Sequence, residues 1–124
     1  MPALILVVDD DEPVRVMLAR LLRMQGYSVV QASSSRNALE RLEEYEPELV
    51  ISDIVMPGES GIELRRSIAR LYPALPFILI SGYSADGPAE FAARTPRTSF
   101  MQKPFAADQL LALVREVLES HSAK

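Results

Sequence analysis

The sequence predicts an α/β fold: a doubly wound, five-stranded parallel sheet in the order 2-1-3-4-5, with about five helices. Short apolar runs alternate along the 124 residues with segments whose apolar residues recur at helical spacing. Such alternation brings each strand back to the same sheet in parallel. The first, third and fourth apolar runs are the most continuous, so they belong at the centre, and the more polar second and fifth runs belong at the edges.

Two strand–helix pairs are expected in the first part of the chain. A strand at residues 3–8 is predicted by an apolar run that stops abruptly at four acids. Pro13 suits the first turn of the helix that follows, and apolar residues at i, i+3, i+4 and i+7 continue to Gly26, which ends it. A more polar strand at 28–32 comes next, and one of the serines at 33–35 caps a second helix that a Glu-Pro pair stops.

The third strand, Leu49–Asp53, carries the central candidate residue. Its apolar start suits a strand buried on both faces, and it ends at Asp53, a carboxylate that belongs at a strand's C-terminal edge. Pro57, Gly58 and Gly61 then break the chain. Ser60 and Glu63 form a capping-box pattern, which predicts that a third helix begins there.

The last part of the chain completes the alternation. A wholly apolar strand at 77–80 ends at Ser81. Glycine and prolines on both sides leave room for only a short fourth helix, around Ala89–Ala93. A more polar fifth strand at 99–102 precedes an amphipathic last helix over 107–118.

Composition narrows the classes of function. The length predicts one domain, residues 1–124, with no output domain. The net charge of −4, with arginines scattered among acids, argues against direct binding of nucleic acid. The absence of cysteine excludes disulfides and thiolate metal sites. The opening apolar run is too short for a membrane span and lacks the basic start of a signal peptide, so we expect a cytoplasmic protein without membrane contact.

Five polar residues stand at the predicted strand ends: Asp9, Asp10, Asp53, Ser81 and Lys103. Each alone has a plainer reading as a helix cap, a turn residue or a solvated amine, but parallel strands end at one rim, where all five converge. Crowded carboxylates raise one another's pKa unless a cation joins them, and oxygen ligands favour Mg²⁺. A phosphoryl group would there meet Mg²⁺, an ammonium and a hydroxyl, with Asp53 as nucleophile.

Four motifs carry a family resemblance: VVDDDEPVR at 7–15, SDIVMPGESG at 52–61, ILISGYS at 78–84 and FMQKPF at 100–105. Together they resemble the response-regulator receiver domain of two-component signalling, including receivers attached to hybrid histidine kinases. The resemblance covers nearly the whole chain. It implies a switch in a phosphorelay, a phosphoacceptor rather than an enzyme, supplied by a histidine kinase or a histidine phosphotransfer protein.

The resemblance also implies residue roles. Asp53 would accept the phosphoryl group. Asp10 and Asp53 would ligate Mg²⁺ together with the Val55 carbonyl, and Asp9 would act through water. Lys103 would pair with Asp53 and then with the phosphoryl oxygens, and the peptide bond after Lys103 is often cis in such domains.

A conformational switch is implied as well. Ser81 would move toward the phosphoryl group and Phe100 would turn inward. A downstream protein or attached domain would read the face formed by the fourth helix, fifth strand and fifth helix, and phosphorylation could drive homodimer formation. Residues 84–99 depart most from the family pattern. Val55 and Tyr83 offer little polar help to an attacking water, which predicts slow autodephosphorylation.

Two rival functions come from other classes. A phosphatase of the haloacid dehalogenase type also uses an aspartate, a Ser or Thr, a Lys and Mg²⁺, and Asp9 and Asp11 could mimic its DxD motif. However, Pro13 stands where threonine or valine is expected, and no acidic pair lies downstream of Lys103. The second rival is a degenerate receiver that only binds proteins, which the intact aspartates and lysine argue against.

Overall fold

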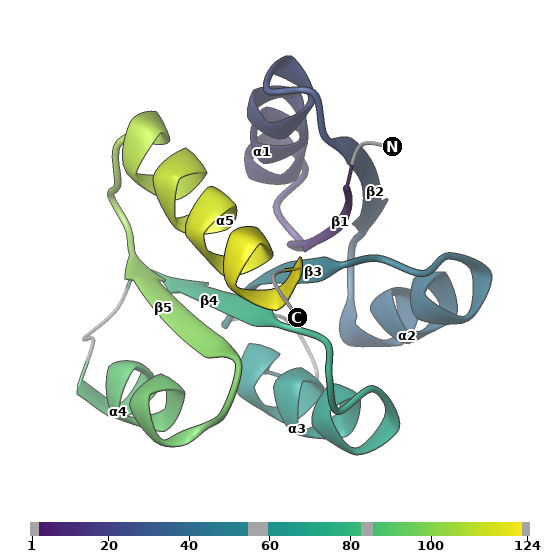
Figure 1. The fold of residues 1–124 in the computed structure, drawn as a ribbon, viewed down its shortest axis with the longest axis vertical. Coiled ribbons are helices and arrows are strands. Elements are labelled where there is room, and N and C mark those ends of the chain that lie inside the picture. Colours follow the sequence, from purple (N-terminus) through teal and green to yellow (C-terminus); the bar gives the residue numbers. More distant parts are fainter. Residues whose placement is uncertain (1–2, 55–59, 83–85, 123–124) are drawn as a thin grey trace.

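The computed structural model describes residues 3–54, 60–82 and 86–122. Within these described residues, five strands alternate with five helices (Figure 1). The elements are β1 (Leu4–Val8), α1 (Glu12–Met24), β2 (Ser28–Ala32), α2 (Ser35–Glu44), β3 (Leu49–Asp53), α3 (Gly61–Leu71), β4 (Phe77–Ser81), α4 (Asp86–Arg94), β5 (Thr98–Gln102) and α5 (Ala107–Ser122).

All strand pairs are parallel and the sheet order is β2-β1-β3-β4-β5, so the predicted topology is confirmed. The register places Val8 beside Ser52 and Ser81 beside Gln102. The carboxyl ends of four neighbouring strands therefore lie along one edge. This edge is the place where ligands bind in open α/β sheets.

Helices cover both faces of the sheet (Figure 1), and two apolar cores result. Leu22 of α1 and Val114 of α5 pack with alternate strand residues such as Ile51 on one face. Leu42 of α2 and Leu64 of α3 pack on the other face. Successive strand residues point to opposite faces, and both faces are buried, which explains why the central strands read as continuous apolar runs.

The ends of helices α1 and α3 carry the residues that the sequence indicates there. The Asp11 side chain accepts a hydrogen bond from the Val14 N–H at the start of α1. The predicted capping box of α3 is confirmed, because the Ser60 and Glu63 side chains each accept a bond from the other residue's N–H, both at 3.2 Å. Gly26 follows α1 with φ of 95°, a conformation that favours glycine.

Helix α4 differs from its prediction. It begins at Asp86 and ends at Arg94, so it is longer than the short helix expected around Ala89–Ala93. Gly87 and Pro88 fall within its first turn, where N–H groups have no partner inside the helix and proline is tolerated. The peptide bond between Lys103 and Pro104 is cis, as the resemblance suggested.

Candidate functional site

The carboxyl edge of the sheet brings the expected residues together. Asp9 and Asp10 follow β1, and the Asp9 N–H donates to the Ala32 carbonyl of β2 at 3.1 Å. Asp53 is the last residue of β3 and Ser81 is the last residue of β4. The sheet therefore supplies three aspartates and a serine to one rim through the strand ends alone.

Three carboxylates form a cluster at this rim. Asp9, Asp10 and Asp53 each offer an oxygen, and these oxygens lie within 4.8 Å of one another. Asp9 is only 2% exposed, whereas Asp10 is exposed and Asp53 is partly buried. Val55, the expected carbonyl ligand, lies outside the described residues, as does Tyr83. An all-oxygen donor set of graded burial fits a hard divalent cation such as Mg²⁺.

Burial makes the cluster electrostatically unfavourable without a cation. Loss of hydration raises the pKa of Asp9, and the nearby charges of Asp53 and Asp10 raise it further, against the lowering effects of the Asp11 N–H and Lys103. Burial also raises the pKa of Asp53, although Lys103 acts against it. The folded protein thus disfavours the charged forms of both groups, which a bound cation would reverse.

Lys103 supplies a positive charge shared by two aspartates. Its Nζ lies 3.5 Å from Asp53 Oδ1 and 3.8 Å from Asp9 Oδ2. Both distances exceed those of strong charge-assisted hydrogen bonds, so the ammonium is not committed to one partner. Its backbone is fixed more firmly, because the Lys103 N–H donates to the Ser81 carbonyl at 2.7 Å. The Lys103 ammonium can therefore move while its backbone stays in place, so it can remain close to a group that becomes attached to Asp53.

Arg15 and Gln31 hold the loop that carries Asp9. Arg15 Nη1 donates to the Asp9 carbonyl at 3.0 Å, and Arg15 Nε donates to Gln31 Oε1 at 3.1 Å. The Asp9 carboxylate itself accepts the Asp11 N–H at 2.9 Å. Sequence reasoning missed this role for Arg15. The available signal was its place in the acidic motif, four residues after the Asp11 cap.

The two proposed switch residues occupy neighbouring strands. Ser81 is buried at 1% exposure at the end of β4. Phe100 of β5 pairs with Leu79 of β4 and is partly buried against the core beneath α2 and α3. The hydroxyl residue and the aromatic residue are therefore linked through adjacent strands.

A buried arginine connects α3 to the start of β5, and sequence reasoning missed it as well. Arg65 is 2% exposed, donates from Nε to Thr98 Oγ1 at 2.7 Å and from Nη2 to the Pro96 carbonyl at 2.9 Å. Its guanidinium also lies 5.5 Å from the centre of the Phe77 ring. Burial, together with the nearby charge of Arg97, lowers the pKa of Arg65. Arg65 occupies an apolar helical position of α3, which gave no sequence signal.

A family model for the response regulator receiver domain matches residues 5–115. The chain is 39% identical over 119 residues to the sensor kinase CckA of Brucella abortus, covering 94% of this chain and 13% of that protein. It is 35% identical over 118 residues to the response regulator MprA of Mycolicibacterium vanbaalenii, covering 95% of this chain and 51% of that protein. The chain thus spans about half or less of the length of these relatives.

Solved structures agree with the sequence relatives. A CheY-like response regulator receiver domain protein from Methanospirillum hungatei superposes with a TM-score of 0.92 at 26% identity, covering 99% of this chain and 98% of that one. NtrX from Brucella abortus gives a TM-score of 0.91 at 34% identity, covering 99% of this chain and 28% of that one. No described helix is long and apolar enough to cross a membrane.

Proposed function

The chain belongs to the response regulator receiver domain family of two-component systems, and from this premise we propose that it is a phosphorylation switch with Asp53 as acceptor. Receiver domains are signalling domains rather than classical enzymes. One observation carries the choice of residue: Asp53 ends the central strand β3 with Lys103 Nζ at 3.5 Å and two further aspartates around it. A binding-only receiver does not require this arrangement. A phosphatase of the haloacid dehalogenase type would share it, but Pro13 and the lack of an acidic pair downstream of Lys103 argue against that function.

The proposed reaction is transfer from a phosphohistidine. An Asp53 carboxylate oxygen forms a bond to phosphorus as the P–N bond breaks, and the bonding electron pair returns to the imidazole nitrogen of the donor. Asp53, Asp10 and the Val55 carbonyl would hold Mg²⁺, with Asp9 acting through water, and the ion would neutralise charge on the phosphoryl oxygens. Lys103 follows the new phosphoryl group, and its ammonium stabilises the developing negative charge.

The switch proposal involves Ser81 and Phe100. Ser81 approaches the phosphoryl oxygens, and Phe100 turns further inward from its partly buried position. Burying a whole phenyl side chain contributes about 1.5–3 kcal/mol, and the part not yet buried contributes less, still within reach of the ~1–3 kcal/mol of ordinary allosteric coupling. Amide NMR with the phosphoryl mimic beryllofluoride tests this, since shifts confined to the Asp53 edge and absent from β5 would contradict it.

The proposed partners follow from the family. The phosphoryl donor is a histidine kinase or a histidine phosphotransfer protein, and a downstream protein or attached domain reads the face made by α4, β5 and α5. We further propose a phosphorylation-dependent homodimer, with no direct contact to nucleic acid or membrane. Native mass spectrometry with and without beryllofluoride tests the dimer, which an unchanged monomer would exclude.

The test of the acceptor is intact-mass spectrometry after incubation with Mg²⁺ and acetyl phosphate. The wild type should gain one phosphoryl group, and Asp53→Asn should gain none. Turnover of a free phosphomonoester would instead favour the phosphatase. A folded wild type that takes no phosphate from acetyl phosphate or from a phosphorylated histidine phosphotransfer protein would favour the binding-only receiver.

A further inference from the structure

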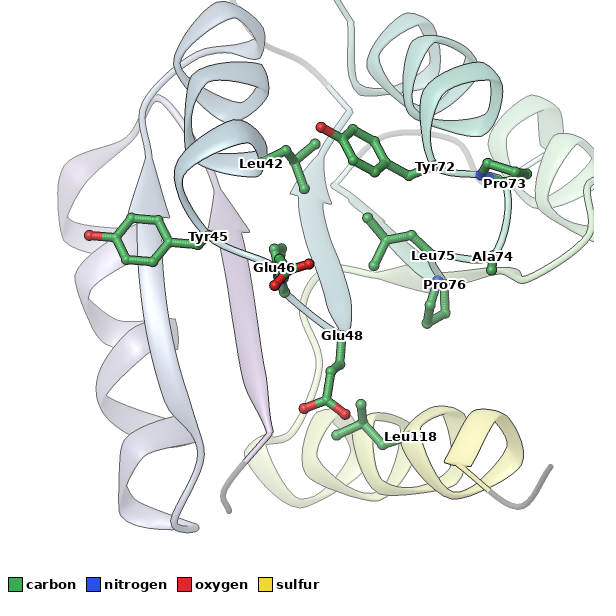
Figure 2. A pocket seen from close by; sticks show the side chains of 11 residues that line it. Leu42, Tyr45, Glu46, Glu48, Tyr72, Pro73, Ala74, Leu75, Pro76 and Leu118 are labelled. Atoms are coloured by element: carbon green, nitrogen blue, oxygen red, sulfur yellow. The ribbon is translucent and has the colours of Figure 1, made fainter.

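An open groove of about 450 Å³ lies at the amino end of the sheet (Figure 2). Its lining includes Pro47 and Glu48, which directly precede β3, and Pro76, which directly precedes β4. The five residues of β3 separate this end from the aspartate edge by about 13 Å, at ~3.3 Å per residue. The groove is therefore a separate site, and its volume falls within the ~300–1,000 Å³ of typical ligand sites.

The groove combines an apolar floor with acidic walls. Leu42 and Leu75 are buried at 4% and 8% exposure, and the Tyr72 ring points toward Leu42 (Figure 2). Glu46 and Glu48 are both exposed, and none of the described lining residues is basic. The net character of the groove is thus apolar and negative, which favours an apolar occupant that carries positive charge.

The backbone of one of the two glutamates, Glu48, is held in place. The Glu48 N–H donates to the Leu4 carbonyl at 2.8 Å, and Glu48 Oε2 accepts the Leu4 N–H at 3.4 Å. The second bond is long and exposed to solvent, so it is weak and leaves the carboxylate able to accept further bonds. A cation that enters the groove can therefore pair with the Glu48 carboxylate without displacing a strong internal partner.

We propose that this groove binds an extended segment of a partner protein that contains prolines and arginine. Proline-rich segments adopt a preformed extended helix and dock into grooves lined by aromatic and apolar side chains, here Tyr72 and the prolines beside it. Arginine matches carboxylates through paired N–H groups, and Glu46 and Glu48 supply the carboxylates. The groove is open to solvent, so a chain can enter and leave it. The site does not depend on phosphorylation of Asp53.

The probe is the peptide acetyl-Arg-Pro-Leu-Pro-Pro-Leu-Pro-Arg-amide, titrated into the ¹⁵N-labelled full chain and followed by amide NMR. We expect shifts at Leu42, Ala74 and Leu75 and none at Asp53. Replacing both arginines with citrulline, a neutral isostere, should weaken binding about fivefold, as loss of two exposed ion pairs implies. Citrulline peptide that binds as tightly as the arginine peptide would overturn the proposal.

Variants of the chain test whether binding depends on the glutamates of the groove or only on the negative charge of the protein. The double change Glu46→Gln and Glu48→Gln should weaken binding about fivefold. Glu43→Gln is the matched control, because Glu43 is exposed on α2 outside the groove lining, and it should bind as the wild type does. Ala74→Arg adds a competing cation at an exposed position of the lining and should abolish binding in a folded protein.

Three further results would overturn the proposal. The first is an absence of shifts at millimolar peptide. The second is a set of shifts that maps to the aspartate edge rather than to the groove. The third is an equal affinity for free argininamide, which would assign the groove to a small organic cation instead of a peptide. Phosphorylation of Asp53 by acetyl phosphate should be unchanged in the Glu46 and Glu48 variant, so this test and the phosphoacceptor test fail separately.

Discussion

Replacement of Gly61 by alanine should damage both stability and phosphorylation. Gly61 is the first residue of α3, and its N–H donates to the Ile54 carbonyl at 2.8 Å. A Cβ at Gly61 would overlap the Asp53 carbonyl oxygen and lie 3.0 Å from Ile54 Cα. These are backbone atoms of the strand end that carries the phosphoacceptor, so either α3 or Asp53 must move.

The expected loss of stability in Gly61→Ala follows from two opposing contributions to the unfolding free energy. Overpacking at a tight site costs about 1–3 kcal/mol. Alanine recovers about 0.5–1 kcal/mol because it restricts the unfolded chain more than glycine does. Because a Cβ at Gly61 would overlap a backbone oxygen, the overpacking cost lies at the upper end of its range, about 2–3 kcal/mol. The net loss in unfolding free energy is therefore about 1–2.5 kcal/mol, or roughly 3–10 °C in Tm for a domain of this size. Phosphorylation should slow by about tenfold or more, because small displacements of a reacting group are costly.

Gly82→Ala provides a matched control at the same sheet edge. A Cβ at Gly82 would meet Lys103 Cβ at 3.8 Å, an ordinary van der Waals distance. This variant should keep its Tm and its rate of phosphorylation. Thermal unfolding followed by circular dichroism, and intact-mass time courses with acetyl phosphate, measure both effects. A wild-type Tm for Gly61→Ala, or an equal loss in Gly82→Ala, would refute the reasoning.

Three further predictions concern charged residues. Without Mg²⁺, Asp53→Asn should raise the unfolding free energy at neutral pH, because burial raises the pKa of Asp53 and so makes its charged form unfavourable in the folded protein. This gain in unfolding free energy should vanish below about pH 4 and grow as pH rises through the folded pKa. Urea unfolding that shows a loss of stability at neutral pH would contradict this prediction. Arg65→Ala should lower the unfolding free energy by about 3 kcal/mol, measured by urea unfolding, whereas Arg66→Ala, at an exposed position, should lower it by less than about 1 kcal/mol. Equal losses in the two variants would contradict a stabilising role for the buried bonds of Arg65. Arg15→Met should weaken Mg²⁺ binding about tenfold by calorimetry, whereas the exposed Arg20→Met should not, and unchanged affinity in Arg15→Met would exclude its positioning role.

The sequence predicted the sheet and the composition of the rim because both depend on short-range patterns. Continuous apolar runs identified the central strands, and polar residues at their ends placed Asp9, Asp53 and Ser81 at one edge. The capping box at Ser60 was equally local. Helix α4 was underestimated because Pro88 was read as a barrier, whereas its position in the first turn makes it compatible with a helix.

These short-range patterns do not predict contacts between residues that are far apart in the sequence. Arg65 lies on the apolar face of α3, where its sequence neighbours do not indicate a polar partner, and its bonds to Pro96 and Thr98 join residues about thirty positions apart. The sharing of Lys103 between Asp53 and Asp9, rather than Asp53 alone, also depends on side-chain placement across three strands. The groove before β3 and β4 forms only when two distant turns meet.

The most direct measurement of the central claim is location of the phosphoryl bond after borohydride trapping. Acetyl phosphate and Mg²⁺ are added, borohydride reduces any aspartyl phosphate to homoserine, and peptide mass spectrometry locates the change. Asp53 as acceptor predicts homoserine at position 53 alone, lost when Mg²⁺ is chelated and reduced in Lys103→Met. Homoserine at Asp9 or Asp10, or equal labelling of Asp53 in the presence of chelator, would contradict the account.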